Sequence, residues 1–263
     1  MIKVLEKKKL SENIYEMSFD VPMIAKNALP GQFLVIMPSE KSERVPLTIA
    51  KSDSNTGRVS VVVMAVGEAT RELVNSDFFY HIAGPLGNPS ELVDMSEEEL
   101  KKEKIVFLAA GVGAAPVYPQ AKFMKEHGVK TDTILAARNE SLLLYEDELN
   151  GVSEVQIATD DGSRGFHGLI TDCLEQLVKD GRKFTRIIAI GPMIMMKFAS
   201  FKAKELGIPI IVSLNPIMLD GTGMCGCCRC LIDGKTKFAC VDGPEFRGEE
   251  VDWDDALTRL KRW

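Results

Sequence analysis

The middle of the chain alternates apolar runs with helix-like segments, and this rhythm constrains the fold more than any other feature. The run KIVFLAAGVG (104–113) is continuously apolar and ends in glycines, and the helix-like segment after it stops at Gly128. Three further apolar runs, TDTILAARN, EVQIATDDG and RIIAIGP, are separated by helical patterns. Strands that alternate with helices indicate a parallel sheet covered on both faces. We therefore predict a doubly wound parallel-sheet α/β domain over residues 98–212.

Residues 1–97 follow a different pattern. Short runs rich in Val, Ile and Phe, such as GQFLVIM and RVSVVVMAV, are separated by turn residues such as Pro30-Gly31 and Asn55-Thr56-Gly57. Six short strands at this spacing predict a small antiparallel β barrel, interrupted by one helix near GEATRELVNS. The charged segment DMSEEELKKEK that follows is expected to be helical, as a linker or a solvated face.

The overall composition excludes several classes of protein. The 263 residues include 32 basic and 38 acidic side chains, a net charge of −6, and a basic surface for sequence-independent nucleic-acid binding is therefore not expected. No apolar run approaches the ~20 residues that cross a bilayer. The first ten residues, MIKVLEKKKL, contain no long apolar stretch of the kind found in secretory signals. We expect a cytoplasmic protein with no nucleic-acid or membrane partner.

The cysteines are concentrated near the C-terminus. Five of the six lie within sixteen residues, at Cys225, Cys227, Cys228, Cys230 and Cys240. In a reducing compartment, such a group is better explained by metal or cluster ligation than by disulfides. Residues 213–263 are therefore predicted to form a small C-terminal metal-binding domain.

The spacing within this group indicates an iron–sulfur site. A plant-type 2Fe–2S site uses C-x4-C-x2-C and a distant fourth cysteine. Asp220, Cys225 and Cys228 have that spacing, with aspartate in the first position. The Asp233-Gly234 pair is a two-residue hairpin signal, which would bring Cys240 back toward Cys228. We predict these four residues, Asp220, Cys225, Cys228 and Cys240, as the ligands of a 2Fe–2S cluster.

Zinc is the main alternative. Cys225 with Cys228, and Cys227 with Cys230, each form half of a zinc site, although no second clean CxxC lies downstream. A zinc-stabilised, redox-sensing binding module would belong to a different functional class. We interpret Cys227 and Cys230 as small apolar residues of the hairpin, and Cys173 as a core residue of a helix.

A glycine motif follows the first strand of the α/β domain. Gly111, Gly113 and Pro116 form G-x-G-x-x-P, where the glycines let the backbone approach a phosphate and the next helix offers its N–H groups. Proline suits the first turn of that helix. Alone, the motif is also compatible with a tight turn that binds nothing.

Polar or glycine-rich residues end three later strands of the same domain. Ligands of open α/β sheets gather at the carboxyl ends of strands, so these positions favour a nicotinamide nucleotide site. For Arg138, the alternative is that it is an ordinary surface charge. The residues are Arg138, Asp160, Asp161, Gly191, Pro192 and Met193.

Two segments of the barrel are candidates for binding a flat ring system and its phosphates. The first has an arginine that is able to hold a phosphate in a bidentate contact. The second opens a helix whose N–H groups and hydroxyl are able to meet a diphosphate. An exposed edge charge and a plain helix cap are the alternatives for the arginine and the threonine. The candidates are Arg44, Pro46, Leu47, Thr48, Gly67, Ala69 and Thr70.

Together these motifs resemble the ferredoxin–NADP reductase superfamily, and within it the iron–sulfur flavoprotein subunits that end in a 2Fe–2S domain. The motifs run in order over nearly the whole chain: PGQF, RVPLTI, VGEAT, GPLGN, AAGVGAAP, TDDGS, GPMIMMK, DGTGMCGCCR and FACVDGPEF. One branch, the electron-transfer subunit of dihydroorotate dehydrogenase, resembles C-G-x-G-x-C-x-x-C, with cysteine where Asp220 stands. The other, the small subunit of NADH-dependent ferredoxin:NADP oxidoreductase, has the aspartate, as here.

The resemblance implies an FAD-binding barrel over 1–97, an NAD(P)-binding domain over 98–212 and a 2Fe–2S domain over 213–263, with the candidate residues above as the contacts. It also implies a larger FAD and 4Fe–4S partner subunit that handles NADP and ferredoxin, and electron bifurcation. The alternative is a dihydroorotate-oxidising partner.

Three positions depart from the superfamily. Pro46 and Leu47 replace the Tyr and Ser of its R-x-Y-[ST] flavin motif, and Ile190 stands where a cysteine often precedes the last Gly-Pro. No Ser–His–Asp pattern is evident, so we expect the cofactors to carry the chemistry.

Overall fold

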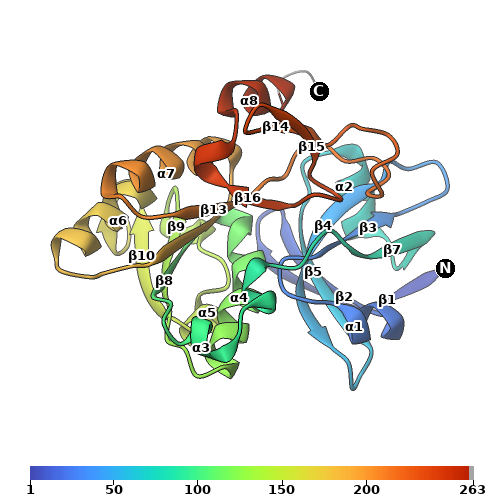
Figure 1. The fold of residues 1–263 in the computed structure, drawn as a ribbon. Coiled ribbons are helices and arrows are strands. Elements are labelled where there is room, and N and C mark those ends of the chain that lie inside the picture. Colours follow the sequence, from blue (N-terminus) through green and yellow to red (C-terminus); the bar gives the residue numbers. More distant parts are fainter. Residues whose placement is uncertain (261–263) are drawn as a thin grey trace.

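The computed structural model describes residues 1–260 and contains two seven-stranded sheets. Figure 1 shows the N-terminal sheet on one side (blue to cyan) and the α/β part on the other (green to orange). The C-terminal segment (red) lies across both parts. None of the helices within residues 1–260 is long and apolar enough to cross a membrane.

The N-terminal sheet is an antiparallel barrel. Its strands are β1 (Ile2–Ser11), β2 (Ile14–Asp20), β3 (Phe33–Met37), β4 (Val45–Asp53), β5 (Arg58–Met64), β6 (Phe78–Phe79) and β7 (His81–Leu86), in the order β6-β1-β2-β5-β4-β3-β7. Strands β6 and β7 are consecutive in the chain but lie at opposite ends of this order, so the sheet curls until it is nearly closed. The predicted barrel is confirmed, with one strand more than expected.

The helices of this part differ from the prediction in detail. Helix α2 (Glu68–Asn75) lies where the sequence predicted it. Helix α1 (Pro22–Asn27) was not predicted, because its six residues are too few to show a helical period. The charged segment after the barrel is helical for only a few residues, in the 3₁₀ turn η1 (Glu91–Asp94) and in α3 (Glu97–Leu100).

The second sheet confirms the doubly wound α/β prediction. Its strands are β8 (Ile105–Ala110), β9 (Asp132–Ala137), β10 (Glu154–Thr159), β11 (Phe166–His167), β12 (Arg186–Ile190), β13 (Ile210–Ser213) and β16 (Glu245–Arg247), in the order β11-β10-β9-β8-β12-β13-β16. All pairs are parallel except β13 with β16. The chain leaves β8 toward β9 and returns later to β12 on the other side. The strand order therefore reverses between β8 and β12, where open α/β sheets bind ligands.

Helices cover both faces of this sheet. One hydrophobic core holds residues of α6 (Ile170–Lys179) and α7 (Met193–Leu206), and the other holds residues of α4 (Ala114–Glu126) and α5 (Glu146–Asn150). The helical pattern predicted between the runs TDTILAARN and EVQIATDDG is not one continuous helix, because only η3 (Glu140–Leu142) and α5 are helical there. Tyr145, buried and left-handed at φ 62°, separates them, because a left-handed residue cannot continue a right-handed helix.

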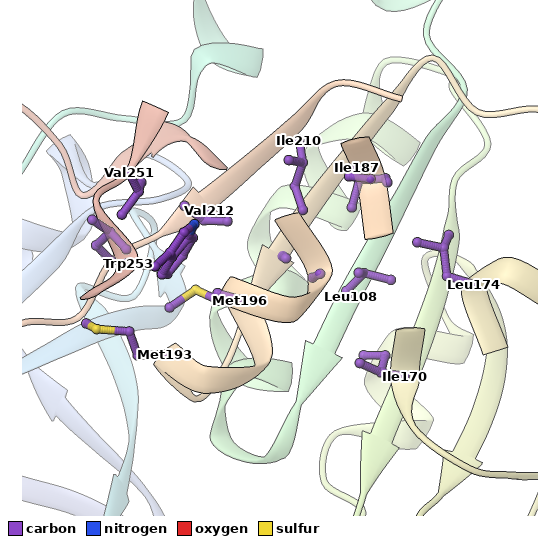
Figure 2. Packing of buried hydrophobic residues seen from close by; sticks show 14 of the residues in the cluster. Leu108, Ile170, Leu174, Ile187, Met193, Met196, Ile210, Val212, Val251 and Trp253 are labelled. Atoms are coloured by element: carbon purple, nitrogen blue, oxygen red, sulfur yellow. The ribbon is translucent and has the colours of Figure 1, made fainter. Parts of the chain in front are cut away.

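The C-terminal segment is anchored in the core of the α/β part. Figure 2 shows Trp253 and Val251 beside Val212 of β13 and Met196 of α7. Trp253 is 6% exposed, and its Nε1–H donates to the Gly248 carbonyl at 3.1 Å. This tryptophan begins helix α8 (Trp253–Leu260), which the sequence analysis did not predict.

The predicted C-terminal hairpin is present. Strands β14 (Arg229–Ile232) and β15 (Lys235–Phe238) pair antiparallel. Asp233 and Gly234 between them both have positive φ, 50° and 68°. Two positive φ values in a two-residue loop match the twist of the flanking strands, which is why Asp-Gly specifies this turn.

Lys51 of β4 connects the barrel to the α/β part. Its Nζ lies 3.0 Å from a carboxylate oxygen of Glu16 in the barrel and 3.1 Å from one of Glu148 in α5. The same ammonium lies 4.8 Å from the ring centroid of Tyr145. One half-buried cation therefore has partners on both sides of the junction, and it stabilises their relative position.

Candidate functional site

The candidate flavin platform lies on β4. Pro46 and Thr48 are two residues apart, so both project from one face of the strand. They are paired with Val35 and Phe33 of β3. Arg44 immediately precedes β4, is exposed and forms no ion pair within the described part of the chain. Its guanidinium is therefore available to an anion.

The second barrel segment is the N-terminus of α2. Gly67 is the exposed N-cap residue, and Ala69 is 6% exposed. The Thr70 hydroxyl accepts N–H groups from Val66 at 3.1 Å and Gly67 at 2.9 Å. The hydroxyl thus caps the helix in this structure. An anion on this segment would instead meet the N–H groups of the first turn of α2, which begins at Glu68.

The candidate nucleotide residues lie along one edge of the α/β sheet. Gly111 follows β8, Arg138 follows β9, Asp160 follows β10 and Gly191 follows β12. These four strands are neighbours, so at about 4.8 Å per strand the residues span about 14 Å. A span of this length fits an extended dinucleotide better than a single small anion. The structure therefore brings together residues that the sequence places up to eighty positions apart.

The two glycines of G-x-G-x-x-P have different surroundings. Gly111 has φ +56°, and a Cβ atom built on it meets nothing within 4 Å in the described part of the chain. A Cβ on Gly113 would lie 2.1 Å from the carbonyl oxygen of Ile190. Gly113 therefore permits close packing of β8 against β12, whereas Gly111 borders an open space that a phosphate is able to fill. Pro116 lies in the first turn of α4, as predicted.

The remaining nucleotide candidates divide into exposed and buried groups. Arg138, Asp160 and Asp161 are exposed at the strand ends. The Ser163 hydroxyl and N–H hold the Asp161 carboxylate and lower its pKa. Pro192 is exposed, but Met193 is 5% exposed and its side chain belongs to the core (Figure 2). Only the backbone of Met193 is near the open edge.

The loop from Asp220 to Cys228 lies directly on the barrel. A Cβ on Gly221, which has φ +74°, would lie 2.9 Å from Leu86 of β7 and 3.0 Å from Val35 of β3. Cys228 and Cys240 belong to the same hydrophobic cluster as Phe33 and Val35. Because Val35 pairs with Pro46, the loop and the candidate flavin platform lie on adjacent strands. Sequence reasoning missed this contact, which joins residues about 180 positions apart.

The predicted ligands form two pairs. The Sγ atoms of Cys228 and Cys240 are 3.2 Å apart, longer than the ~2.05 Å of a disulfide and close to the ~3.7 Å expected for two thiolates at ~2.3 Å from one tetrahedral metal. The Asp220 carboxylate accepts the N–H groups of Thr222 at 2.8 Å and Cys225 at 2.7 Å. The second pair is therefore Asp220 with Cys225.

The pKa shifts distinguish the two pairs. The Thr222 N–H, with the Cys225 N–H, lowers the pKa of Asp220, and the Cys227 N–H lowers the pKa of Cys225. Burial raises the pKa of Cys240 to about 12. A metal ligand must be deprotonated, so Asp220 and Cys225 are prepared for ligation, whereas Cys240 requires the charge of the metal to lose its proton.

These donors fit a two-metal cluster better than one ion. A single tetrahedral zinc needs all four donors about 2.3 Å from one point. Within residues 1–260, no three histidine, cysteine or acidic side chains converge in that way. Two separate pairs suit a larger group. The Cys230 thiol instead lies in the core and contacts the Lys237 carbonyl at 3.6 Å, as expected for a hairpin residue.

A cavity also lies away from these residues. It measures about 710 Å³ and separates the barrel from α4, with Ser18, Lys51 and Tyr118 in its wall. The described residues that line this cavity include none of the predicted site residues. The candidate binding residues lie instead at the strand ends and in the cysteine loop, and we place the candidate site there.

Comparison with known proteins shows which family the chain resembles. Residues 215–252 match the family model for the iron–sulfur cluster binding domain of dihydroorotate dehydrogenase B. The chain is 46% identical to a dihydroorotate dehydrogenase B (NAD(+)) electron transfer subunit homolog of Thermotoga maritima, over 99% of this chain and 90% of that one. It is 52% identical to an uncharacterised protein from the adh 3′ region of Clostridium beijerinckii, over 98% of this chain and 89% of that one.

A solved structure is similar over the full length. It belongs to an NADH-dependent reduced ferredoxin-NADP oxidoreductase, studied for flavin-based electron bifurcation. The matching chain is 43% identical, with a TM-score of 0.93, over 100% of this chain and 94% of that one. The fold is therefore shared along the whole length of this chain.

Proposed function

The chain belongs to the family of the dihydroorotate dehydrogenase B electron-transfer subunits and their homologues, and we propose that it oxidises NADH and relays the electrons to a larger partner subunit. The observation that carries this proposal is the position of the Asp220–Cys228 loop. It lies on β3 of the barrel, one strand from Pro46 and Thr48. Groups held on these two surfaces would be close enough for direct electron transfer.

The cofactors in this proposal are FAD, NAD(H) and a 2Fe–2S cluster, with NADP(H) as an alternative nucleotide. FAD, when bound, accepts two electrons together, and an iron–sulfur centre passes them on singly. The flavin contacts are Arg44, Pro46, Leu47, Thr48, Gly67, Ala69 and Thr70. The cluster ligands are Asp220, Cys225, Cys228 and Cys240. The three predicted domains, 1–97, 98–212 and 213–263, each carry one cofactor site.

The residues of the chain position and neutralise these groups. Arg44 offers a free guanidinium to a flavin phosphate, and the first turn of α2, which follows the exposed Gly67, offers its backbone N–H groups. The open space at Gly111 admits the nucleotide diphosphate at the point where the strand order reverses. The half-buried Pro46 and Thr48 present a surface on one face of β4 without a stacking tyrosine.

The partner in this proposal is a larger FAD and 4Fe–4S subunit that handles NADP and ferredoxin, in a cytoplasmic complex that bifurcates electrons. Asp220 in the first ligand position supports this branch, together with the 43% identical solved structure. The names of the curated relatives and of the matching cluster domain favour a second candidate, in which the partner oxidises dihydroorotate.

Cofactor analysis tests the proposal. The purified protein is expected to hold about one FAD and two irons per chain, and to give a 2Fe–2S EPR signal on reduction. Zinc without flavin would refute it. Cys228→Ala is expected to lose the EPR signal, whereas the matched variant Cys230→Ala, at a core position two residues away, keeps it. Assays of the co-purified complex with ferredoxin and NADP, or with dihydroorotate, then distinguish the two partners.

A further inference from the structure

Glu245 of β16 has a carboxyl group buried where the three parts of the chain meet. Its backbone pairs with Ser213 of β13. Its Oε1 accepts the Gln120 Nε2–H of α4 at 2.6 Å, and the Ser90 hydroxyl, just after the barrel, donates to Gln120 Oε1 at 3.3 Å. Ser90 and Gln120 are both 0% exposed. The carboxyl is therefore held by a short buried chain of hydrogen bonds.

The barrel also closes against this carboxyl. A Cβ built on Gly31, in the turn before β3, would lie 3.3 Å from Glu245 Oε1 and 2.7 Å from the Ser90 nitrogen. Only glycine allows so close an approach. The carboxyl thus touches the barrel, helix α4 and the segment that follows the cysteine loop.

The second oxygen of this carboxyl is buried without a hydrogen-bond partner in the described part of the chain. The charged groups around it are Arg186 of β12 and Arg247 of its own strand. The Arg186 guanidinium contacts Glu91 and Glu103, and Arg247 is exposed. An ionised carboxylate here has no ion pair, so its burial is costly. Burial raises the pKa of Glu245 to about 7, against the opposing effects of Ser90, Gln120 and Arg186.

Glu245 is also close to the proposed cluster. Its neighbour Phe246 packs against the hydrophobic cluster that contains Phe33, Cys228 and Cys240. Glu245 is five positions after Cys240 in the chain, so their Cα atoms are at most ~18 Å apart. Charges at such distances interact appreciably through the protein interior, where the dielectric constant is below that of water.

We propose that Glu245 is a proton-binding site coupled to electron transfer through this chain. The carboxylate binds one proton from solvent when one electron arrives on the neighbouring 2Fe–2S centre, and it releases that proton when the electron leaves. The electron and the proton enter together, so the net charge of the region around Glu245 and the cluster stays constant. This inference rests on the cluster assignment of the proposed function.

The coupling has a definite sign. A nearby negative charge raises the pKa of a carboxyl group, so reduction favours protonation of Glu245. By reciprocity, protonation favours reduction. The midpoint potential of the cluster is therefore expected to fall as the pH rises through about 7 and to level off where Glu245 is ionised in both redox states.

Redox titration of the EPR signal from pH 6 to 9 tests this. The wild-type potential is expected to fall with pH, whereas Glu245→Gln keeps a pH-independent potential near the wild-type value at pH 6. Glu249→Gln, a matched change at an exposed position four residues away, should follow the wild type. A wild-type potential that does not change with pH, or an equal change in Glu245→Gln, would overturn the proposal.

An infrared measurement covers the case in which Glu245→Gln does not fold. The reduced-minus-oxidised spectrum of the wild type at pH 7.5 should gain the carbonyl band of a protonated carboxyl group, which shifts on ¹³C-glutamate labelling. A spectrum without that band refutes the coupling. If the protein has no 2Fe–2S EPR signal at all, the proposed function itself fails, and the two failures are thus distinguishable.

Discussion

Replacing the two glycines of G-x-G-x-x-P separately will distinguish a packing role from a binding role. In Gly113→Ala, the new Cβ would lie 2.1 Å from the Ile190 carbonyl oxygen. Ordinary contacts begin near 3.4 Å, so the turn after β8 and the end of β12 must separate by more than 1 Å. In Gly111→Ala, the new methyl group meets nothing within 4 Å among the described residues, and the cost is that of a left-handed alanine.

The magnitudes follow from these geometries. Overpacking against backbone costs at least 1–3 kcal/mol and more where main chain must move, so we expect about 4 kcal/mol for Gly113→Ala. A left-handed alanine costs roughly 1–2 kcal/mol. At roughly 2–4 °C per kcal/mol for a chain of this size, the melting temperature should fall by roughly 12 °C in Gly113→Ala and roughly 4 °C in Gly111→Ala.

Two assays separate the roles. Thermal unfolding of the flavin-loaded proteins, followed by circular dichroism, ranks their stability. NADH titration at 25 °C, below both transitions, measures binding, and Gly111→Ala is expected to bind at least tenfold more weakly because its methyl group occupies the phosphate space. Equal melting temperatures for the two variants would refute the packing argument. Unchanged NADH affinity in Gly111→Ala would refute the binding argument.

Three further variants test other parts of the molecule. Cys240→Ala should abolish the cluster signal and lower the melting temperature, since it removes one thiol of the 3.2 Å pair; an intact signal would exclude it as a ligand. Lys51→Met should cost about 2 kcal/mol in urea unfolding, because it leaves the buried Glu16 and the half-buried Glu148 unpaired, and stability equal to wild type would contradict this. The pKa of Glu245 is raised from 4.5 to about 7 on folding, so wild-type stability should fall between these pH values by about 2.5 × 1.36, or about 3 kcal/mol. The unfolded chain ionises in this range while the folded one stays protonated, and unfolding of Glu245→Gln should lack the fall.

Local sequence patterns were sufficient for much of this architecture. The Asp233-Gly234 turn and the G-x-G-x-x-P turn were predictable, because a few adjacent residues determine each backbone path. The C-x4-C-x2-C spacing located the cysteine loop for the same reason. Helix α1 was missed since six residues carry too little periodicity.

Long-range pairings were not predictable. Strand β16 pairs with β13 across about thirty residues, and neither strand is long enough to show alternation. The contact of Gly221 with Val35 and the burial of Glu245 depend on how separate parts pack. A glutamate in the motif FACVDGPEF is ordinary in the sequence, and only its surroundings make it unusual. The ligand roles themselves remain predictions.

The late position of β16 has a consequence for synthesis on the ribosome. The chain emerges from its N-terminus, so the barrel and β8 to β13 are available before residues 245–247 exist. Until then β13 is an unpaired edge, with Ile210, Ile211 and Val212 able to pair with another chain. A nascent or truncated chain is therefore vulnerable to aggregation until residues 245–247 are made. The segment that carries the cysteines also contains β16, which covers this edge of β13. Removing the segment would leave the edge exposed, so we do not expect it to be separable as an independent module.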